Sequence, residues 1–120
     1  MSSKILVVDD AVFMRNILKD YLESNGYEVV AEACNGAEAV HLYRQYLPDL
    51  VTMDLSLPVV NGLEALKEIK QFDPDARIVI CSTLGQKNMI IQAIEAGAKD
   101  FMIKPILQDR LIERIEAILA

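Results

Sequence analysis

The sequence predicts a doubly wound α/β domain, in which a five-stranded parallel sheet carries five helices on its two faces. Three observations support this prediction: short apolar runs recur along the chain, stretches with helical periodicity separate them, and the connections between the two are short. Strict alternation of this kind requires crossover connections, which make the strands parallel and distribute the helices over both faces. At 120 residues, a single domain spanning residues 1–120 is the simplest organisation.

The predicted strands are short and mostly apolar, as expected for strands that are buried on both faces. They cover Ile5–Val8, Glu28–Ala33, Leu50–Met53, Arg77–Ser82 and Asp100–Ile103. The third strand has the clearest end, because Pro58 and the Asn61-Gly62 pair follow it and require a loop. Asp54 therefore lies where this strand leaves the sheet.

The predicted helices follow the strands in order. They cover Val12–Asn25, 36–47, Gly62–Phe72, Gln86–Ala96 and Gln108–Leu119. Gly26 and Gly97 are typical helix stops, Pro48 closes the second helix, and Asn35 is a suitable cap at its beginning. In the first helix, helical spacing predicts one buried face made of Phe13, Ile17, Leu18, Tyr21 and Leu22.

Composition and charge exclude several classes of protein. The formal net charge of -6 argues against a sequence-independent grip on nucleic acid, which needs clustered Lys and Arg. No apolar run approaches the ~20 residues of a membrane helix, and the N-terminus lacks the layout of a signal peptide. We therefore expect a cytoplasmic protein without direct nucleic-acid binding or membrane insertion, in which Cys34 and Cys81 are reduced thiols.

Charged side chains follow three of the predicted strands at their carboxyl ends. Asp9 and Asp10 follow the first strand, Asp54 the third and Lys104 the fifth. If the strand order is 2-1-3-4-5, one of the two common orders of such sheets, the order reverses between strands one and three. Ligands of open parallel sheets bind at that reversal, so fold topology and acid placement indicate the same site.

Three carboxylates at one sheet edge repel one another unless a cation lies among them. Oxygen ligands favour Mg²⁺ (or Mn²⁺), and the formal charges of the acids and of Mg²⁺ plus Lys104 then balance. Beside such a metal and an ammonium group, Asp54 could attack a phosphorus centre and become an acyl phosphate. The alternative is that the acids only solubilise strand ends, with Asp10 capping the first helix.

The chain resembles the receiver domains of bacterial two-component signalling over essentially its whole length. The matching motifs are Val7-Val-Asp-Asp10, Met53-Asp-Leu-Ser-Leu-Pro58 with Asn61-Gly62, Ser82-Thr83, Ala96-Gly-Ala98 and Lys104-Pro105. Each motif alone is weak, whereas five motifs in register are specific. The segments 7–15 and 81–86 look most like single-domain chemotaxis regulators of this family.

The resemblance implies a role for each matching residue. Asp54 is the phosphoacceptor for a histidine kinase, and Mg²⁺ is bound by Asp10, Asp54 and the backbone carbonyl of Ser56, with Asp9 acting mainly through water. The family pattern further makes Lys104 a ligand of the phosphoryl oxygens. Ser82 and Phe101 fall at the two switch positions, and the Lys104–Pro105 bond is expected to be cis.

Some positions depart from the family pattern. Thr83 and Leu84 follow Ser82, where the family usually has Ala or Gly in the first of these positions. We hypothesise that both side chains crowd the path of the hydrolytic water and lengthen the life of the phosphorylated state. Phe101 has no hydroxyl and so lacks any hydrogen bond that a tyrosine would form there.

The fourth predicted helix has more apolar residues than one buried stripe requires. We expect Ile91 and Ala93 to face inward, which leaves Ile90 and Ile94 outward. The resemblance implies a partner surface on helix four, strand five and helix five that includes Lys87, Ile90, Ile94 and Phe101. The expected partners are the histidine kinase, a target such as a motor switch protein or an output domain, and a phosphatase.

Four alternatives remain open at this point. A flavodoxin-like cofactor binder would need a phosphate loop after strand one, where the chain has Asp9 and Asp10 instead. A haloacid-dehalogenase-type phosphatase would need an Asp-x-Asp motif there. A phosphorylation-independent scaffold of the same fold, and a receiver domain cut from a longer regulator with a DNA-binding output, are harder to exclude.

Overall fold

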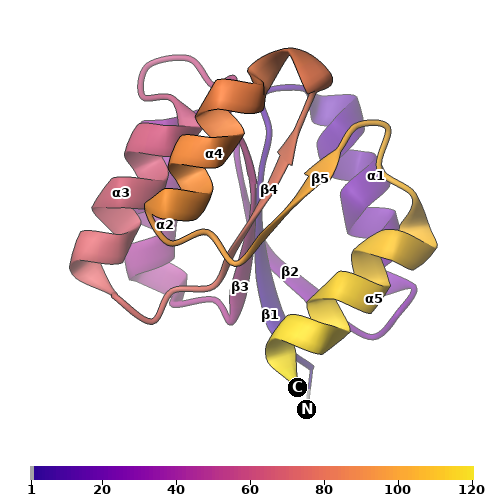
Figure 1. The fold of residues 1–120 in the computed structure, drawn as a ribbon. Helices are drawn as coiled ribbons and strands as arrows, with labels where there is room; N and C mark the ends of the chain where they lie inside the picture. Colours follow the sequence, from indigo (N-terminus) through magenta and orange to yellow (C-terminus); the bar gives the residue numbers. More distant parts are fainter. Residues whose placement is uncertain (1) are drawn as a thin grey trace.

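The computed structural model describes residues 2–120 and contains one five-stranded parallel sheet in the order β2-β1-β3-β4-β5 (Figure 1). The strands are β1 (Lys4–Val8), β2 (Glu28–Ala33), β3 (Leu50–Asp54), β4 (Ile78–Ser82) and β5 (Asp100–Ile103). Both the parallel arrangement and the predicted order are confirmed. The order reverses between β1 and β3, which pair directly, with Val8 opposite Met53.

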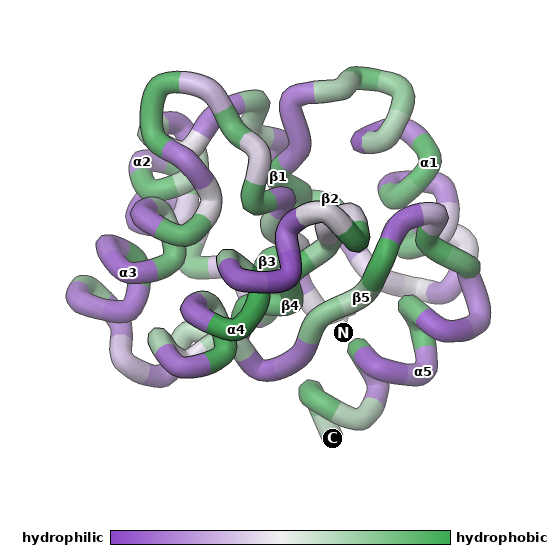
Figure 2. Tube along the Cα trace, turned by 45° about the horizontal axis from the view of Figure 1, so that its top comes forward, coloured by the Kyte–Doolittle hydropathy of each residue, from purple (hydrophilic) through white to green (hydrophobic). Residues whose placement is uncertain are grey.

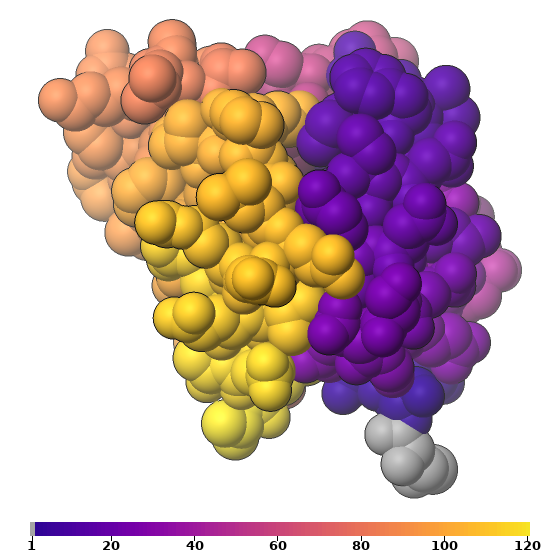
Figure 3. Space-filling model, turned by 90° about the vertical axis from the view of Figure 1, so that its right-hand side faces the viewer, coloured from indigo at the N-terminus to yellow at the C-terminus, as the bar shows by residue number. Residues whose placement is uncertain are grey.

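The helices form two layers on the faces of the sheet (Figure 1). They are α1 (Val12–Glu23), α2 (Gly36–Tyr46), α3 (Gly62–Phe72), α4 (Lys87–Glu95) and α5 (Gln108–Leu119). Helices α2, α3 and α4 cover one face, and α1 and α5 lie side by side on the other (Figure 3). A short 3₁₀ helix, η1 (Leu84–Gln86), precedes α4 and was not predicted.

The strands supply both halves of the core, because successive side chains of a strand point to opposite faces. In β1, Leu6 and Val8 pack with α2, α3 and α4, whereas Ile5 and Val7 pack with α1 and α5. All four side chains are buried, and burying one such side chain contributes roughly 1.5–3 kcal/mol. Figure 2 shows green stretches along the central strands, whereas green and purple alternate along the helices, as expected for helices with one buried face.

The helix ends follow the signals in the sequence. The side chain of Asn35 accepts a hydrogen bond from the backbone N–H of Glu38, which confirms the predicted cap of α2. Asn61 accepts one from Glu64 in the same way at the beginning of α3. Gly97 follows α4 with a φ of +113°, a backbone conformation that strongly favours glycine.

The predicted orientations of three apolar side chains, in two helices, are wrong. In α1, Phe13 is 63% exposed, because Met14, Leu18 and Leu22 form the stripe that meets the sheet. In α4, Ile90 is buried and Ile91 is exposed, the reverse of the expectation. Helical periodicity shows that a helix has an apolar stripe, but it does not fix how the helix is rotated about its axis against the sheet. A rotation by about one residue explains the errors in both helices.

Within the part of the chain that the structure describes, no helix combines the length and apolar character needed to cross a membrane.

Candidate functional site

Three carboxylates meet at the carboxyl edge of the sheet. Asp9 and Asp10 follow β1, Asp54 is the last residue of the neighbouring β3, and one oxygen from each lies within 4.8 Å of the others. Asp9 and Asp54 are buried, with exposed fractions of 1% and 5%, whereas Asp10 is exposed. The site predicted from the strand ends is thus assembled, with its outermost acid open to solvent.

Backbone N–H groups hold the two buried carboxylates. Asp9 accepts a hydrogen bond from the N–H of Ala11 at 2.9 Å, and Asp54 accepts one from the N–H of Ser56 at 3.1 Å. The N-cap residue of α1 is Ala11, and no side chain caps this helix. Asp10 is therefore not a helix cap, and its carboxylate lies in the cluster with Asp9 and Asp54. Both buried acids are therefore fixed by the loops that begin directly after them.

Gly62 allows α3 to begin close to the end of β3. A Cβ atom at this position would collide with the backbone carbonyl of Asp54 and come within 2.7 Å of the Cα of Leu55. The N–H of Gly62 also donates to the carbonyl of Leu55 at 3.0 Å. A residue without a side chain is thus required here, because the loop after Asp54 folds back tightly onto the strand.

Lys104 brings a cation into the cluster from the end of β5. Its Nζ lies 2.8 Å from Oδ2 of Asp9 and 3.4 Å from Oδ2 of Asp54. Its backbone N–H donates to the carbonyl of Ser82 at 2.7 Å, which ties the ends of β4 and β5 together. The Lys104–Pro105 peptide bond is cis, as predicted.

The electrostatics of the cluster favour one more cation. Burial raises the pKa of Asp54, and Lys104 and the N–H of Ser56 only partly offset this effect. Burial lowers the pKa of Lys104, but its bond to Asp9 and the charges of Asp54 and Asp9 outweigh this, so its pKa is raised. Lys104 therefore remains charged, while the three acids carry more negative charge than one ammonium group neutralises.

The donor set fits a hard divalent cation. All three side chains offer carboxylate oxygens, one of them on the open side of the cluster, and the close spacing lets one ion touch all three. Mg²⁺ is commonly held by one or two carboxylates with water and phosphate oxygens in the remaining positions. These residues therefore fit the predicted metal. The backbone carbonyl of Ser56, the remaining predicted ligand, lies two residues beyond Asp54 in the chain.

Ser82 lies at the same edge, as predicted, and its hydroxyl has a partner that the sequence did not indicate. The side chain is fully buried and its hydroxyl donates to Oε1 of Gln86, four residues further along. The Nε2 of Gln86 in turn donates to the hydroxyl of Ser56 in the loop after β3. Gln86 thus bridges two loops, a relation between residues 30 apart that no local pattern predicts.

Arg15 is a second residue that sequence reasoning missed. Its Nη1 donates to the backbone carbonyl of Asp9 at 2.7 Å, and its Nε donates to Glu32 in β2 at 3.1 Å. These two bonds anchor the peptide between Asp9 and Asp10 to the edge strand. The spacing of an arginine six residues after Asp9, on the first helical turns, is the signal that could have indicated this contact.

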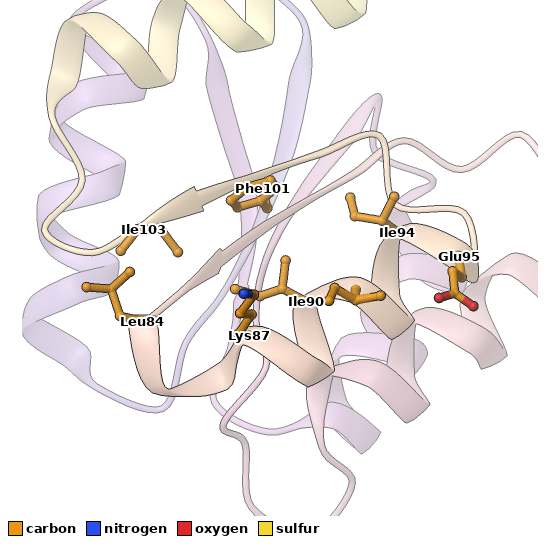
Figure 4. A pocket seen from close by; sticks show the side chains of 8 residues that line it. Leu84, Lys87, Ile90, Ile94, Glu95, Phe101 and Ile103 are labelled. Carbon is orange, nitrogen blue, oxygen red and sulfur yellow. The ribbon is translucent and has the colours of Figure 1, made fainter.

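A groove lies beside the site, between η1, α4 and β5 (Figure 4). Its volume is about 440 Å³, and it is lined by Leu84, Lys87, Ile90, Ile91, Ile94, Glu95, Phe101 and Ile103. Phe101 is 41% exposed and Leu84 is 79% exposed. All four residues of the predicted partner surface, Lys87, Ile90, Ile94 and Phe101, thus line one groove, although Ile90 contributes from a buried position.

The fold and the acidic site define a doubly wound α/β domain with its binding site where the strand order reverses. Comparison with protein families identifies the family: the model of the response regulator receiver domain matches residues 5–116. The chain belongs to this family. Its strand order is the one described for flavodoxin and for the chemotaxis protein CheY.

Close relatives of the chain are chemotaxis proteins. The chain is 58% identical over 115 residues to CheY of Bacillus subtilis, with 96% of each chain covered. It is 50% identical over 118 residues to CheY of Thermotoga maritima, with 98% of each chain covered. The chain is therefore a two-component receiver domain closely related to CheY, and the flavodoxin-like and phosphatase alternatives are excluded.

Solved structures agree with this assignment. A crystal structure of the CheX-CheY-BeF3-Mg+2 complex from Borrelia burgdorferi superimposes with a TM-score of 0.93 and 31% identity, covering 98% of this chain and 90% of that chain. The response regulator domain of Thermotoga maritima CheB has a TM-score of 0.91 and 37% identity, covering 99% and 97%. The fold of the chain is thus that of a receiver domain throughout.

Proposed function

We propose that residues 1–120 form one receiver domain that acts as a phosphorylation-activated switch, in which Asp54 accepts a phosphoryl group from a histidine kinase. One observation carries this proposal: Asp54 is buried between a lysine and two further carboxylates, at the point where the strand order reverses. The close relatives named CheY support a role in chemotaxis.

In the proposed transfer, a carboxylate oxygen of Asp54 forms a new bond to phosphorus. The bond from phosphorus to the ring nitrogen of the donor histidine breaks, and that nitrogen keeps the electron pair. Lys104 would stabilise charge on the transferred oxygens, which its distance of 3.4 Å from Asp54 supports. A bound Mg²⁺ would neutralise charge on the acids and the phosphoryl group.

The same arrangement accounts for the expected ligands of the metal. Asp10, Asp54 and the backbone carbonyl of Ser56 would bind the ion, with Asp9 contributing through water. Asp9 is already bonded to Lys104 and to the N–H of Ala11, which supports this indirect role. The CheY chain of Borrelia burgdorferi was crystallised with CheX, BeF3 and Mg²⁺, which supports both the metal and the existence of protein partners.

The response to phosphorylation is proposed to reach partners through the groove between α4 and β5. Ser82, at the end of β4, would bond the phosphoryl group, and Phe101 would turn inward from its exposed position. Such a change shifts a two-state equilibrium and alters the surface that a target protein binds. Ile94 and Phe101, both partly exposed apolar side chains, are the residues a partner could bury there.

The proposed phosphoacceptor is tested by intact mass after incubation with a small acyl phosphate, with and without Mg²⁺. Wild type should gain one phosphoryl group only with Mg²⁺, and Asp54→Asn should gain none. Asp75→Asn, at an exposed aspartate in the turn after α3, is the matched control and should behave as wild type. Absence of any modification in wild type would favour the phosphorylation-independent scaffold.

The proposed groove is tested with the variant Ile94→Glu in a pull-down with a cognate target. Binding that depends on phosphorylation should be lost while Asp54 still accepts the phosphoryl group. Ile94 is preferable to Ile90 for this test, because Ile90 is buried and a charge there would disrupt the packing of α4 against the sheet. Retained binding would remove the groove from the proposal. The matched control is Gln92→Glu, which adds a charge at an exposed position of α4 outside the groove.

A further inference from the structure

Gln86 joins the two loops that flank the site. It is the last residue of η1 and directly precedes α4. Its Oε1 accepts hydrogen bonds from the hydroxyl of Ser82 and, at 3.3 Å, from the N–H of Thr83. Its Nε2 donates to the hydroxyl of Ser56. One amide side chain thus connects the end of β4 with the loop after Asp54.

The bond to Ser82 has a direct chemical consequence. A serine hydroxyl carries a single hydrogen and can donate only one hydrogen bond at a time. In this structure that hydrogen bond goes to Gln86, and the hydroxyl is fully buried and so has no access to water. Ser82 therefore cannot donate to a phosphoryl oxygen until it releases Gln86.

We propose that Gln86 is a positioning residue for Ser82 that holds its hydroxyl in the unphosphorylated arrangement and competes with the phosphoryl group for its hydrogen. The inference rests on the proposed function of Asp54 and Ser82 and adds the group that opposes activation. Without Gln86, the free state would contain a buried hydroxyl that lacks its partner, and the phosphorylated arrangement would gain in relative stability.

Release of Gln86 also affects the groove. Gln86 precedes Lys87, and Leu84 and Lys87 both line the groove, so these three residues belong to one continuous turn. The bond from Gln86 to Ser56 holds this turn against the loop after β3. When Ser82 changes partner, the turn loses one of its two side-chain anchors. Through Ser82 and Gln86, phosphorylation of Asp54 could therefore alter the position of the residues at the beginning of α4.

The test replaces Gln86 by methionine, which has a similar length and shape but neither the acceptor nor the donor. The probe is beryllofluoride, a phosphoryl analogue, in excess Mg²⁺. Because the chain has no tryptophan, binding is followed by calorimetry or by the backbone NMR signals of Ser56 and Thr83. Gln86→Met should bind beryllofluoride about threefold to tenfold more tightly than wild type, the range expected for one hydrogen bond.

A double-mutant cycle shows whether Gln86 acts through Ser82. In a Ser82→Ala background the hydroxyl is absent, so Gln86→Met should then change the affinity for beryllofluoride by less than about twofold. Ser56→Ala, which removes the other anchor of Gln86, should tighten binding in the same direction by a smaller factor. Gln92→Met, the same substitution at an exposed position of α4, should leave the affinity unchanged.

The outcomes separate this inference from the proposed function. If wild type binds beryllofluoride but Gln86→Met binds it equally or more weakly, Gln86 does not oppose activation and the inference is wrong. An equal gain in the Ser82→Ala background would also overturn it, because Gln86 would then act without Ser82. If wild type does not bind beryllofluoride at all, the proposed function fails, and this inference fails with it.

Discussion

The two halves of the candidate site are held in different ways. The half formed by β1, β3 and β5 contains Asp9 and Asp54, each of which accepts hydrogen bonds from Lys104 and from a backbone N–H group. The half formed by β4 and η1 contains Ser82, whose hydroxyl depends on one side chain, and Leu84, which is 79% exposed. The first half is fixed by several contacts for each group, and the second by few.

This difference matches the separate requirements of chemistry and response. Charges that stabilise a transferred group act best when they are already in place, because no reorganisation is then needed during the reaction. A response element must instead have two arrangements of similar free energy. The structure combines both by placing the acids and the lysine in the fixed half and the switch hydroxyl in the other. Substitutions in the two halves should therefore have different consequences, and four predictions test this difference.

The largest effect is expected for Lys104→Met in the fixed half. The change removes the only ammonium group bonded to Asp9 and Asp54 among the described residues. Phosphorylation by a small acyl phosphate should slow by about 100-fold, the usual loss when one stabilising donor is removed. Stopped time points analysed by intact mass give the rate. Lys99→Met, at an exposed position before β5, should keep the wild-type rate, and an equal loss there would contradict the special role of Lys104.

The second prediction compares one glycine from each half. Gly62→Ala should lower the free energy of unfolding by about 3 kcal/mol, because its Cβ would collide with the backbone at Asp54 and Leu55. Gly85→Ala, where a Cβ would meet nothing within 4 Å, should raise it by about 0.5 kcal/mol. Urea denaturation measures both. Equal effects would show that the two halves are packed equally tightly.

The third prediction concerns the charge of Asp54 in buffer without metal. Burial raises its pKa above the ordinary value of 3.8, so the folded state loses stability as the pH rises from that value through the raised pKa. Asp54→Asn avoids this loss and should be more stable than wild type at pH 7. Below pH 3.8 the difference should disappear.

Urea denaturation at several pH values measures this difference, with Asp75→Asn as the control at an exposed site. Added Mg²⁺ should stabilise wild type more than Asp54→Asn, because a bound ion stabilises the state that binds it. Wild type that is more stable than Asp54→Asn in metal-free buffer at pH 7 would show that Lys104 fully compensates the buried charge.

The smallest effect is expected in the second half, for the variant Thr83→Ala, Leu84→Ala. Both side chains are exposed beside Ser82, so their removal should leave phosphorylation unchanged and open a path for water. We expect the phosphorylated state to decay a few-fold faster, about 0.5–1 kcal/mol in activation free energy. Loss of the mass gain with time after removal of the donor gives the rate. Decay that is no faster than in wild type would contradict the predicted crowding.

The sequence predicted the fixed half better than the other. Strand ends such as Met53-Asp54 follow from local signals, an apolar run followed by proline and Asn-Gly, and parallel strands bring such ends together without further information. Ile90 and Phe13 were misplaced because their orientation depends on how each helix is rotated against the sheet. Gln86 was missed because its contacts with Ser56 and Ser82 depend on loop geometry that periodicity does not encode.

The two cysteines provide a way to observe the molecule without engineering. Cys81 is buried opposite Asp54 in the sheet, and burial raises the pKa of its thiol to about 12. Cys34 is exposed at the end of β2, directly after Ala33, whose carbonyl accepts a hydrogen bond from the N–H of Asp9. A maleimide dye should therefore label the native protein at Cys34 alone. A single fluorophore would then stand next to the acidic site and report its occupation in real time.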